Sequence, residues 1–291
     1  MTSIAWIHNG NAEAWTEGRW GPAAELPVPC DARGLLLAEG VFETILVIDG
    51  APQWLQVHHQ RWLAGALLLG LQPPPPLAAV EGLLHDAIER SGISTGALRL
   101  NWCRGSGPRG LAAPDHGHQP AGNHLFWLQL SAITPSFTPV AVIISPTEVR
   151  NGTSLLSRCK SFGYGSALIA RRQATEAGAD DALLRSSTGA LCCATSANLL
   201  VQIDNVWLTP PLESGCLPGV MRRRALELGL TQETTLSEGD LERSSGALLL
   251  NSLGCRPIQH HGRTVMPGPG GHGASARAEQ LWRQLLDNQG R

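Results

Sequence analysis

"KSFGYGSALIARRQATEAGADDALL", residues 160–184, begins with Lys160, the only lysine in a chain of 291 residues that contains 21 arginines. Arginine can replace lysine at solvated or ion-paired positions, but a guanidinium group stays protonated and cannot act as an amine nucleophile. The single lysine is therefore a candidate for amine chemistry. From Tyr164 to Ala177 the stretch has a helical pattern, and Gly178 is expected to cap the end of that helix.

The segments that follow predict an antiparallel β-meander. "DDALLR", "ALCCATSANLLVQI" and "VWLTPP" read as strands separated by a Ser-Thr-Gly turn and an Asp-Asn turn. A helix is expected next, in "PGVMRRRALELG" (218–229), with Gly219, Val220 and Met221 in its first turn. The unpaired N–H groups and positive dipole end of such a turn can bind phosphate.

The segments before the lysine predict strands and helices in alternation. "VFETILVIDG" (41–50) reads as a strand that ends in an Asp-Gly turn, with "APQWL" as its hairpin partner. Helices are expected over 58–71, which "PPPP" ends, and over 77–91. Strands are expected over 96–105 and 123–133, before the proline-interrupted segment "TPSFTP". The sequence thus predicts an α/β (α+β) fold with a small domain over 1–133, a linker at 134–139 and a larger domain over 140–291.

Composition favours a cytoplasmic protein that acts on a small molecule. The formal net charge is −2, so neither a nucleic-acid surface nor a basic membrane face is indicated. The sequence "MTSIAWIHNG" lacks a basic and apolar leader pattern, and no apolar run approaches the length of a bilayer span. The seven cysteines have no CxxC spacing, and the paired histidines lack neighbouring ligands, so no metal site is expected.

Two arginines flank a glycine-rich segment, "RGSGPRG" (104–110), that matches the pattern GxGxxG. A dinucleotide fingerprint requires a helix directly afterwards, but "LAAPDHGHQPAG" contains two prolines and no helical period. We expect instead a loop carrying Arg104 and Arg109, which is either solvated or a clamp for a carboxylate. Arg61, on the first predicted helix, is similarly either solvated or a second cation for the phosphate.

Seven stretches in order resemble the fold-type IV pyridoxal-phosphate enzymes, which include branched-chain aminotransferases, D-amino acid aminotransferases and aminodeoxychorismate lyases. The stretches are "DARGLLLAEGVFET" (31–44), "HHQRWLAGALLLGL" (58–71), "RGSGPRGL" (104–111), residues 160–184, "ATSANLL" (194–200), "ESGCLPGVMR" (213–222) and "LLLNSLGCRPI" (248–258). The resemblance implies a small α/β domain followed by a pseudo-barrel domain, pyridoxal 5'-phosphate as cofactor, and a homodimer.

The resemblance also implies roles for individual residues. Lys160 would form a Schiff base with the cofactor and then act as a general base. Thr44, Arg104 and Arg109 would lie around the substrate. The phosphate and its surroundings would be held by residues from separate segments: Arg61, Ser196, Val220, Met221, Asn251 and Ser252.

Among the subfamilies, "RGSGPRGL" and "NSLGCRPI" look most like aminodeoxychorismate lyase. That reaction converts 4-amino-4-deoxychorismate to 4-aminobenzoate and pyruvate, for folate biosynthesis. An amino-acid transaminase of the branched-chain or D-amino acid type, and a cofactor-binding homologue without turnover, remain as alternatives.

Cys193 departs from the family pattern. The family places a glutamate five residues before the asparagine of "SAN", where it pairs with the protonated ring nitrogen of the cofactor; here that position holds Cys193. A neutral thiol is a poor partner for a pyridinium, so the cofactor ring should withdraw electrons less strongly. The departure puts transamination in more doubt than the lyase reaction, because forming an aromatic product favours elimination.

Overall fold

The computed structural model describes residues 3–9, 18–107, 110–111, 124–262, 264–265 and 272–287. It divides into two compact units: unit 1 comprises Met1–Thr134 and Cys159–Gly163, and unit 2 comprises Pro135–Arg158 and Tyr164–Arg291. The short segment that contains Lys160 therefore belongs to unit 1, although the chain on either side of it belongs to unit 2.

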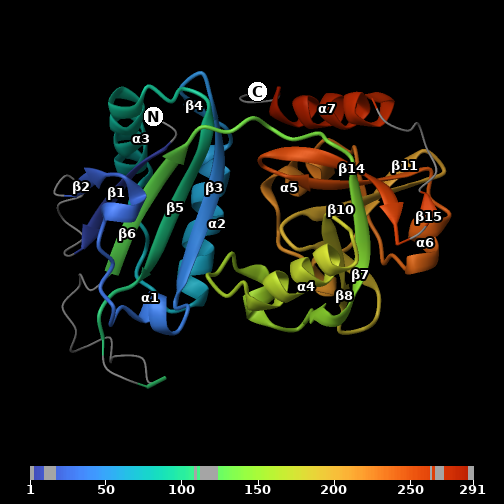
Figure 1. The fold of residues 1–291 in the computed structure, drawn as a ribbon, viewed down its shortest axis with the longest axis horizontal. Coiled ribbons are helices and arrows are strands. Elements are labelled where there is room, and N and C mark those ends of the chain that lie inside the picture. The colour runs from blue at the N-terminus through green and yellow to red at the C-terminus, as the bar shows by residue number, and fades with distance from the viewer. Residues whose placement is uncertain are drawn as a thin grey trace. The chain divides into compact units, whose positions relative to one another are not determined.

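Unit 1 is built on one antiparallel sheet of six strands in the order β2-β1-β6-β5-β3-β4, with the central strands seen edge to edge in Figure 1. The strands are β1 (Ser3–Asn9), β2 (Arg19–Gly21), β3 (Gly40–Ile48), β4 (Ala51–Pro52), β5 (Gly96–Arg104) and β6 (His124–Ser131). The predicted hairpin between β3 and β4 is confirmed. Asp49 and Gly50 both have positive φ, 49° and 79°, as a two-residue hairpin turn with the twist of the strands requires.

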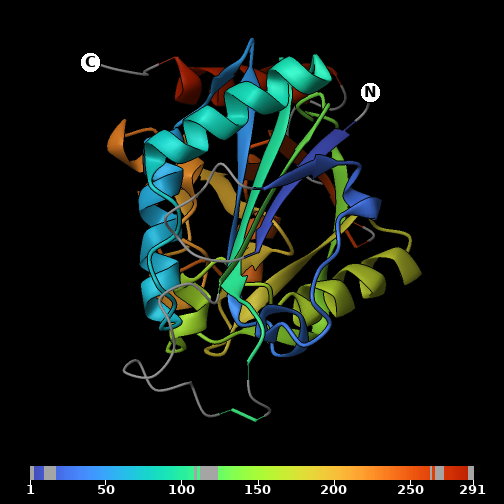
Figure 2. The same ribbon diagram turned by 90° about the vertical axis from the view of Figure 1, so that its left-hand side faces the viewer.

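Two helices, α2 (Leu55–Leu68) and α3 (Leu77–Ser91), pack on one face of this sheet (Figure 2). Trp62 and Ala66 of α2 face the sheet and are 1% and 0% exposed. α2 begins and ends a few residues before the predicted range, and α3 starts directly after Pro76. A short helix, α1 (Arg33–Leu36), lies beside β5, and a 3-10 turn, η1, spans Ala23–Glu25.

Unit 2 contains a nine-stranded sheet in which the pairing of β9 with β10 closes a ring. The ring runs β10-β13-β14-β7-β8-β9 and back to β10; β14–β7 and β7–β8 are parallel, and its other pairs are antiparallel. Its strands are β7 (Val140–Arg150), β8 (Asp181–Ser186), β9 (Leu191–Ala194), β10 (Asn198–Ile203), β13 (Gly246–Asn251) and β14 (Gly254–His261). Outside the ring lie β11 (Val206–Thr209), β12 (Gln232–Glu233) and β15 (Thr264–Val265). The predicted meander is confirmed as β8 to β11.

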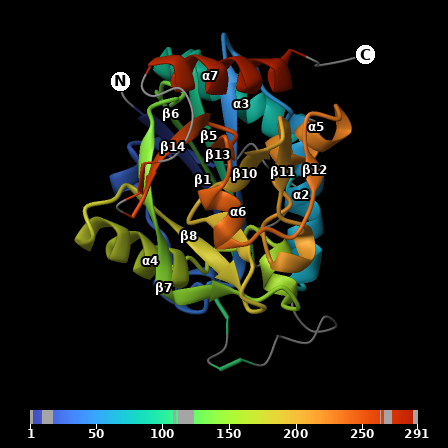
Figure 3. The ribbon, with the colours of Figure 1, turned by 90° about the vertical axis from the view of Figure 1, so that its right-hand side faces the viewer.

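The longer helices of unit 2 pack on the outside of its strands (Figure 3). Helix α4 (Gly165–Glu176) lies on β7 and β8, and α7 (His272–Leu286) lies on β14. As predicted, the chain leaves α4 through Gly178, which has a φ of 74°. Two shorter helices, α5 (Val220–Glu227) and α6 (Glu238–Glu242), and the 3-10 turns η2 (Leu155–Arg158) and η3 (Leu212–Ser214) complete the unit. In the described part of the chain, no helix combines the length and the apolar character needed to cross a bilayer.

Candidate active site

Strand β3 presents different chemistry on its two faces. Successive side chains of a strand point to opposite faces, and Val41, Ile45 and Val47 join the core under α2 and α3. Glu43 shares that face, whereas Phe42 and Thr44 lie on the other. Glu43 and the Phe42 ring, beside which Lys160 lies, are therefore on opposite faces of the strand.

Glu43 is fully buried and holds two basic side chains of α2. Arg61 donates from Nε to Oε1 at 2.8 Å and from Nη2 to Oε2 at 2.6 Å, and His58 Nδ1 lies 2.7 Å from Oε2. Burial alone raises the pKa of this carboxyl, but Arg61 and His58 together outweigh burial and lower the pKa of Glu43 to about 2. The pKa of His58 is lowered, mainly by burial. The carboxylate fixes the Arg61 guanidinium in one orientation, which sequence spacing did not indicate.

Lys160 is attached to unit 1 by main-chain bonds on both sides. Its carbonyl accepts from Phe42 N at 2.9 Å, Phe162 N donates to Gly40 O at 3.0 Å, and Val41 and Ser161 form a β-bridge. The Nζ atom lies 4.3 Å from the centre of the Phe42 ring. The main-chain bonds therefore hold the backbone of residue 160 against β3 whatever its side chain, and the amine lies beside the Phe42 ring.

Arg99 on β5 is a second cation on the Phe42 ring, and sequence analysis missed it. Its guanidinium carbon lies 3.7 Å from the ring centre, and β5 places it opposite Thr44. Nε donates to Asn101 Oδ1 at 2.8 Å, which orients the group. An amine and a guanidinium thus share one aromatic ring beside Thr44, an arrangement suited to an anionic substrate. Only knowledge of the β3–β5 register could have revealed it.

The expected loop position of Arg104 is wrong, because this residue is the last of β5 and is buried. Its Nε pairs with Glu39 Oε1 at 2.6 Å, and Nη2 donates to the carbonyl of Gly70 at 2.8 Å. Contact between Arg104 and substrate stays a prediction, but two of its donors already have protein partners. Arg109 lies outside the described residues.

In unit 2, the first turn of α5 has the features of an anion site. Val220 and Met221 are 3% and 2% exposed, and their backbone N–H groups form no hydrogen bond within the described part of the chain. Buried N–H groups without partners are rare in folded proteins. A phosphate at this helix N-terminus would satisfy both groups.

Asn198, at the start of β10, holds the approach to that turn, and its role was not foreseen. Its Nδ2 donates to the carbonyl of Leu217 at 3.0 Å. A Cβ added to Gly219 would lie only 2.0 Å from Asn198 Oδ1, so only glycine fits this close approach. The asparagine of the "SAN" motif therefore positions the N-terminus of α5.

Three of the predicted cofactor residues lie close together in unit 2. Asn251 ends β13, donates from Nδ2 to the carbonyl of Ser196 at 3.4 Å, and accepts from Leu253 N at 2.9 Å. Ser252 follows in the turn before β14. The antiparallel register of β10 and β13 sets Asn198 opposite Leu250. Strand β10 therefore connects the residues around Asn251 with the first turn of α5.

Cys193 lies on β9 opposite Asn198 and is buried. It shares a cluster with Cys192 and Cys216. Hydrogen bonding with Cys193 and Cys216, together with burial, raises the pKa of Cys192, so the thiol of Cys192 stays protonated. The position that the family fills with a carboxylate thus lies in a cluster of three cysteines, beside the protonated thiol of Cys192.

Comparisons with known proteins agree with this arrangement. The sequence model of the amino-transferase class IV family matches residues 40–260. A bifunctional aminodeoxychorismate lyase/D-amino acid transaminase of Mycobacterium tuberculosis is 26% identical over 245 residues, covering 74% of this chain and 78% of that protein. The structure of a candidate 4-amino-4-deoxychorismate lyase from Legionella pneumophila is 28% identical, with a TM-score of 0.78, covering 90% of this chain and 97% of that one.

The fold alone is supported by a further structure, that of the branched-chain amino acid aminotransferase from Escherichia coli. It aligns with a TM-score of 0.83 at 18% identity, covering 100% of this chain and 98% of that one. The predicted combination of a small sheet domain and a pseudo-barrel domain is confirmed by this match and by the closed ring of strands in unit 2.

Proposed function

Because the chain belongs to the amino-transferase class IV family, whose members use pyridoxal phosphate, we propose that it converts 4-amino-4-deoxychorismate to 4-aminobenzoate and pyruvate. Membership of the family and the similar proteins indicate a class IV enzyme that is either this lyase or an aminotransferase. The observation that carries the choice of the lyase is Cys193, which stands where transamination calls for a carboxylate.

The residues present fit pyridoxal phosphate in each unit taken by itself. In unit 2, the N–H groups of Val220 and Met221 would hold the phosphate, with Ser196, Asn251 and Ser252 beside it. In unit 1, Arg61 offers an oriented guanidinium and Lys160 offers the only ε-amine of the chain. When bound, the cofactor supplies an aldehyde that condenses with amines and a ring that withdraws electrons.

In the proposed reaction, the amine of Lys160 moves a proton. It removes the hydrogen from C4 of the substrate ring, the C–O bond to the enolpyruvyl group breaks, and a proton is returned to that group as pyruvate leaves. The ring becomes aromatic in the same sequence, so no oxidant or reductant is consumed. Arg99 and Thr44, which are paired across β3 and β5, would orient the substrate.

The test of this function is a paired assay of the holoprotein. With 4-amino-4-deoxychorismate we expect 4-aminobenzoate and pyruvate in equal amounts, read by fluorescence and by a coupled dehydrogenase. In parallel, D-alanine or a branched-chain amino acid is offered with 2-oxoglutarate. Amino transfer without 4-aminobenzoate would favour the transaminase instead, and cofactor binding without either reaction would indicate an inactive homologue.

Replacing Arg99 with leucine is expected to raise KM for the carboxylate substrate by roughly ten- to a hundredfold, since a hydrogen bond to a charged group contributes about 1.5–3 kcal/mol. Bound cofactor, read by absorbance, should be unchanged. Arg90→Leu, which removes an exposed guanidinium near Trp20 on a different element, is the matched control. Equal KM values for the two variants would remove Arg99 from the substrate site.

Replacing Cys193 with glutamate is expected to raise the transamination side reaction by about tenfold or more, because a carboxylate can pair with a protonated ring nitrogen. Cys193→Gln, which adds similar bulk without charge, should not show the increase. Both rates are measured as keto acid formed from an amino donor. If the glutamate variant stays at the wild-type rate while retaining cofactor, the argument from Cys193 is wrong.

We further propose that the protein acts as a homodimer. Each unit exposes large apolar side chains, with Leu35 and Leu36 61% and 62% exposed in unit 1, and Leu155 and Leu168 61% and 69% exposed in unit 2. Exposed apolar side chains that gather in one patch are typical of interfaces. Sedimentation velocity of the holoprotein should give twice the chain mass, and a monomer at micromolar concentration would contradict the proposal.

A further inference from the structure

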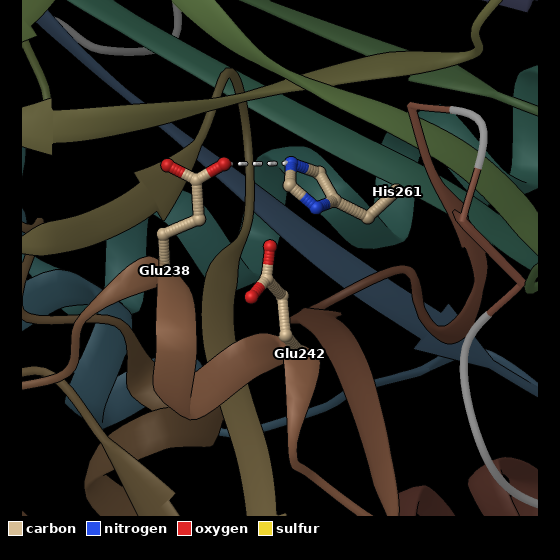
Figure 4. Close-up of side chains that lie close together, drawn as sticks. All are labelled: Glu238, Glu242 and His261. Carbon is tan, nitrogen blue, oxygen red and sulfur yellow. Dashed lines mark ion pairs between the residues drawn. The ribbon is translucent and has the colours of Figure 1, made fainter.

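Three potential metal-binding side chains meet in unit 2. Glu238, Glu242 and His261 each bring a ligand atom to within 4.8 Å of the others (Figure 4). The two carboxylates come from α6, and the imidazole comes from the end of β14. Their separation in sequence is why the paired histidines gave no sign of a ligand set.

The elements that carry these side chains are well fixed. A capping box between Ser237 and Asp240 closes the first turn of α6, and Leu241, 0% exposed, anchors that helix in the core. Glu238 and Glu242 are four residues apart, so their side chains are neighbours on the helix surface. His261 pairs with Thr264 in the β14–β15 hairpin, and Gly262 N donates to Val142 O at 2.9 Å.

Two of the three donors have no hydrogen bond in the described residues. The side chain of His261 is 11% exposed, and its Nε2 lies 3.7 Å from Glu238 Oε1, an ion-pair contact that is too long for a hydrogen bond (Figure 4). Glu242 forms neither a hydrogen bond nor an ion pair with any described residue. The imidazole and the two carboxylates thus face one another in the way that the ligands of a metal ion do.

Arg185 orients the third donor rather than occupying the site. Its Nη2 donates to Oε2 of Glu238 at 2.5 Å, so the other oxygen, Oε1, is left facing His261. A hydrogen bond to the outer oxygen of a ligating carboxylate is a regular feature of metal sites. The arrangement therefore combines one imidazole nitrogen, two carboxylates and a hydrogen bond from Arg185 to the outer oxygen of Glu238.

We propose that Glu238, Glu242 and His261 bind one divalent transition-metal ion of the zinc class. A mixed nitrogen and oxygen set suits Zn²⁺ or Co²⁺, whereas Mg²⁺ and Ca²⁺ prefer oxygen ligands alone. Bonds to Zn²⁺ are about 2.0–2.2 Å long, so the three donors need to close in slightly on the ion, with water at the fourth position. The ion would cross-link α6 to the end of β14 and stabilise unit 2, whatever reaction the protein catalyses.

The test is a Co²⁺ titration of tag-free holoprotein that has been stripped with a chelator. The wild type should bind one Co²⁺ and develop visible d–d absorption. His261→Gln should weaken Co²⁺ binding at least about tenfold, because a ligand has been removed. His260→Gln changes the neighbouring histidine of the same strand and should bind as the wild type does. Equal affinity in His261→Gln and wild type, or no binding by the wild type, overturns the proposal.

Two further measurements distinguish binding at this site from binding to cysteines and from the effects of unfolding. Sulfur-to-cobalt charge-transfer bands in the near ultraviolet would place the ion on thiols and overturn the proposal. Added Zn²⁺ should raise Tm in the wild type and in His260→Gln, but not in His261→Gln or Glu242→Gln. A Zn²⁺-dependent rise of the same size in all four proteins would likewise overturn it.

Discussion

Replacing Lys160 with alanine is expected to abolish turnover, lowering the rate by at least about 10³-fold, because the proposed reaction loses both its amine nucleophile and its general base. The variant should still fold, because the hydrogen bond from Phe42 N goes to the main-chain carbonyl of residue 160 and does not depend on the side chain. The rate of 4-aminobenzoate formation and the unfolding transition are measured for the wild type and for the variant. Wild-type turnover in the variant would contradict the proposed function.

The chain offers an unusually clean chemical control for this experiment. Lys160 carries its only ε-amine, so borohydride reduction in the presence of pyridoxal phosphate should add a phosphopyridoxyl group to one internal peptide, seen by mass spectrometry. Lys160→Arg keeps the positive charge and should lose both the adduct and the activity. A variant that loses the adduct and keeps the activity would show that catalysis does not require an amine at this position.

Replacing Glu43 with glutamine is expected to lower the free energy of unfolding by about 3–5 kcal/mol, because removing one partner of a buried ion pair leaves the Arg61 charge uncompensated. The same substitution should weaken cofactor binding, since Arg61 loses two oriented contacts. Unfolding is followed by tryptophan fluorescence in urea, and cofactor affinity by absorbance. Glu81→Gln, on the exposed face of α3, should change stability by less than about 0.5 kcal/mol.

The pH dependence of this difference has a defined sign. The pKa of Glu43 falls from 4.5 to about 2 on folding, so its stabilisation is complete above pH 4.5 and is lost as the pH falls towards 2. The lowered pKa of His58, which is present in both proteins, reduces the stability of each as the pH falls below its ordinary value of 6.5. The stability gap between wild type and Glu43→Gln should therefore narrow below pH 4.5, and a gap that is constant down to pH 2 would exclude the ion-pair explanation.

Local signals in the sequence predicted the elements well. The Asp-Gly turn, the proline run before α3 and the glycine after α4 each act on the few residues beside them, so their effect can be read without knowing the fold. The ends of α2 were misplaced by a few residues, because Trp54 and the hairpin before it fix where that helix begins. The closure of the ring by β9 and β10 could not be derived from strand patterns alone.

The site was harder to predict because its contacts join distant segments. Glu43 meets Arg61 only once α2 is packed on β3, and Arg99 reaches Phe42 only in the observed strand register. Arg104 fell both in the predicted strand over 96–105 and in the predicted loop, and pairing with His124 makes it the last residue of β5. Sequence spacing cannot supply these distances. The resemblance of motifs named Lys160 and several residues expected around it, but not Glu43 or Arg99.

The interleaved path of the chain affects how the protein can be divided. The chain passes between the two units at 134/135, at 158/159 and again at 163/164. A single proteolytic cut near residue 134 would thus separate the amino-terminal fragment from residues 159–163. These residues would stay covalently joined to the carboxy-terminal fragment, although their main-chain bonds are to β3 of the amino-terminal fragment. Two separately expressed fragments, 1–134 and 135–291, should therefore bind each other through residues 159–163. A 135–291 fragment that lacks residues 159–163 should not bind.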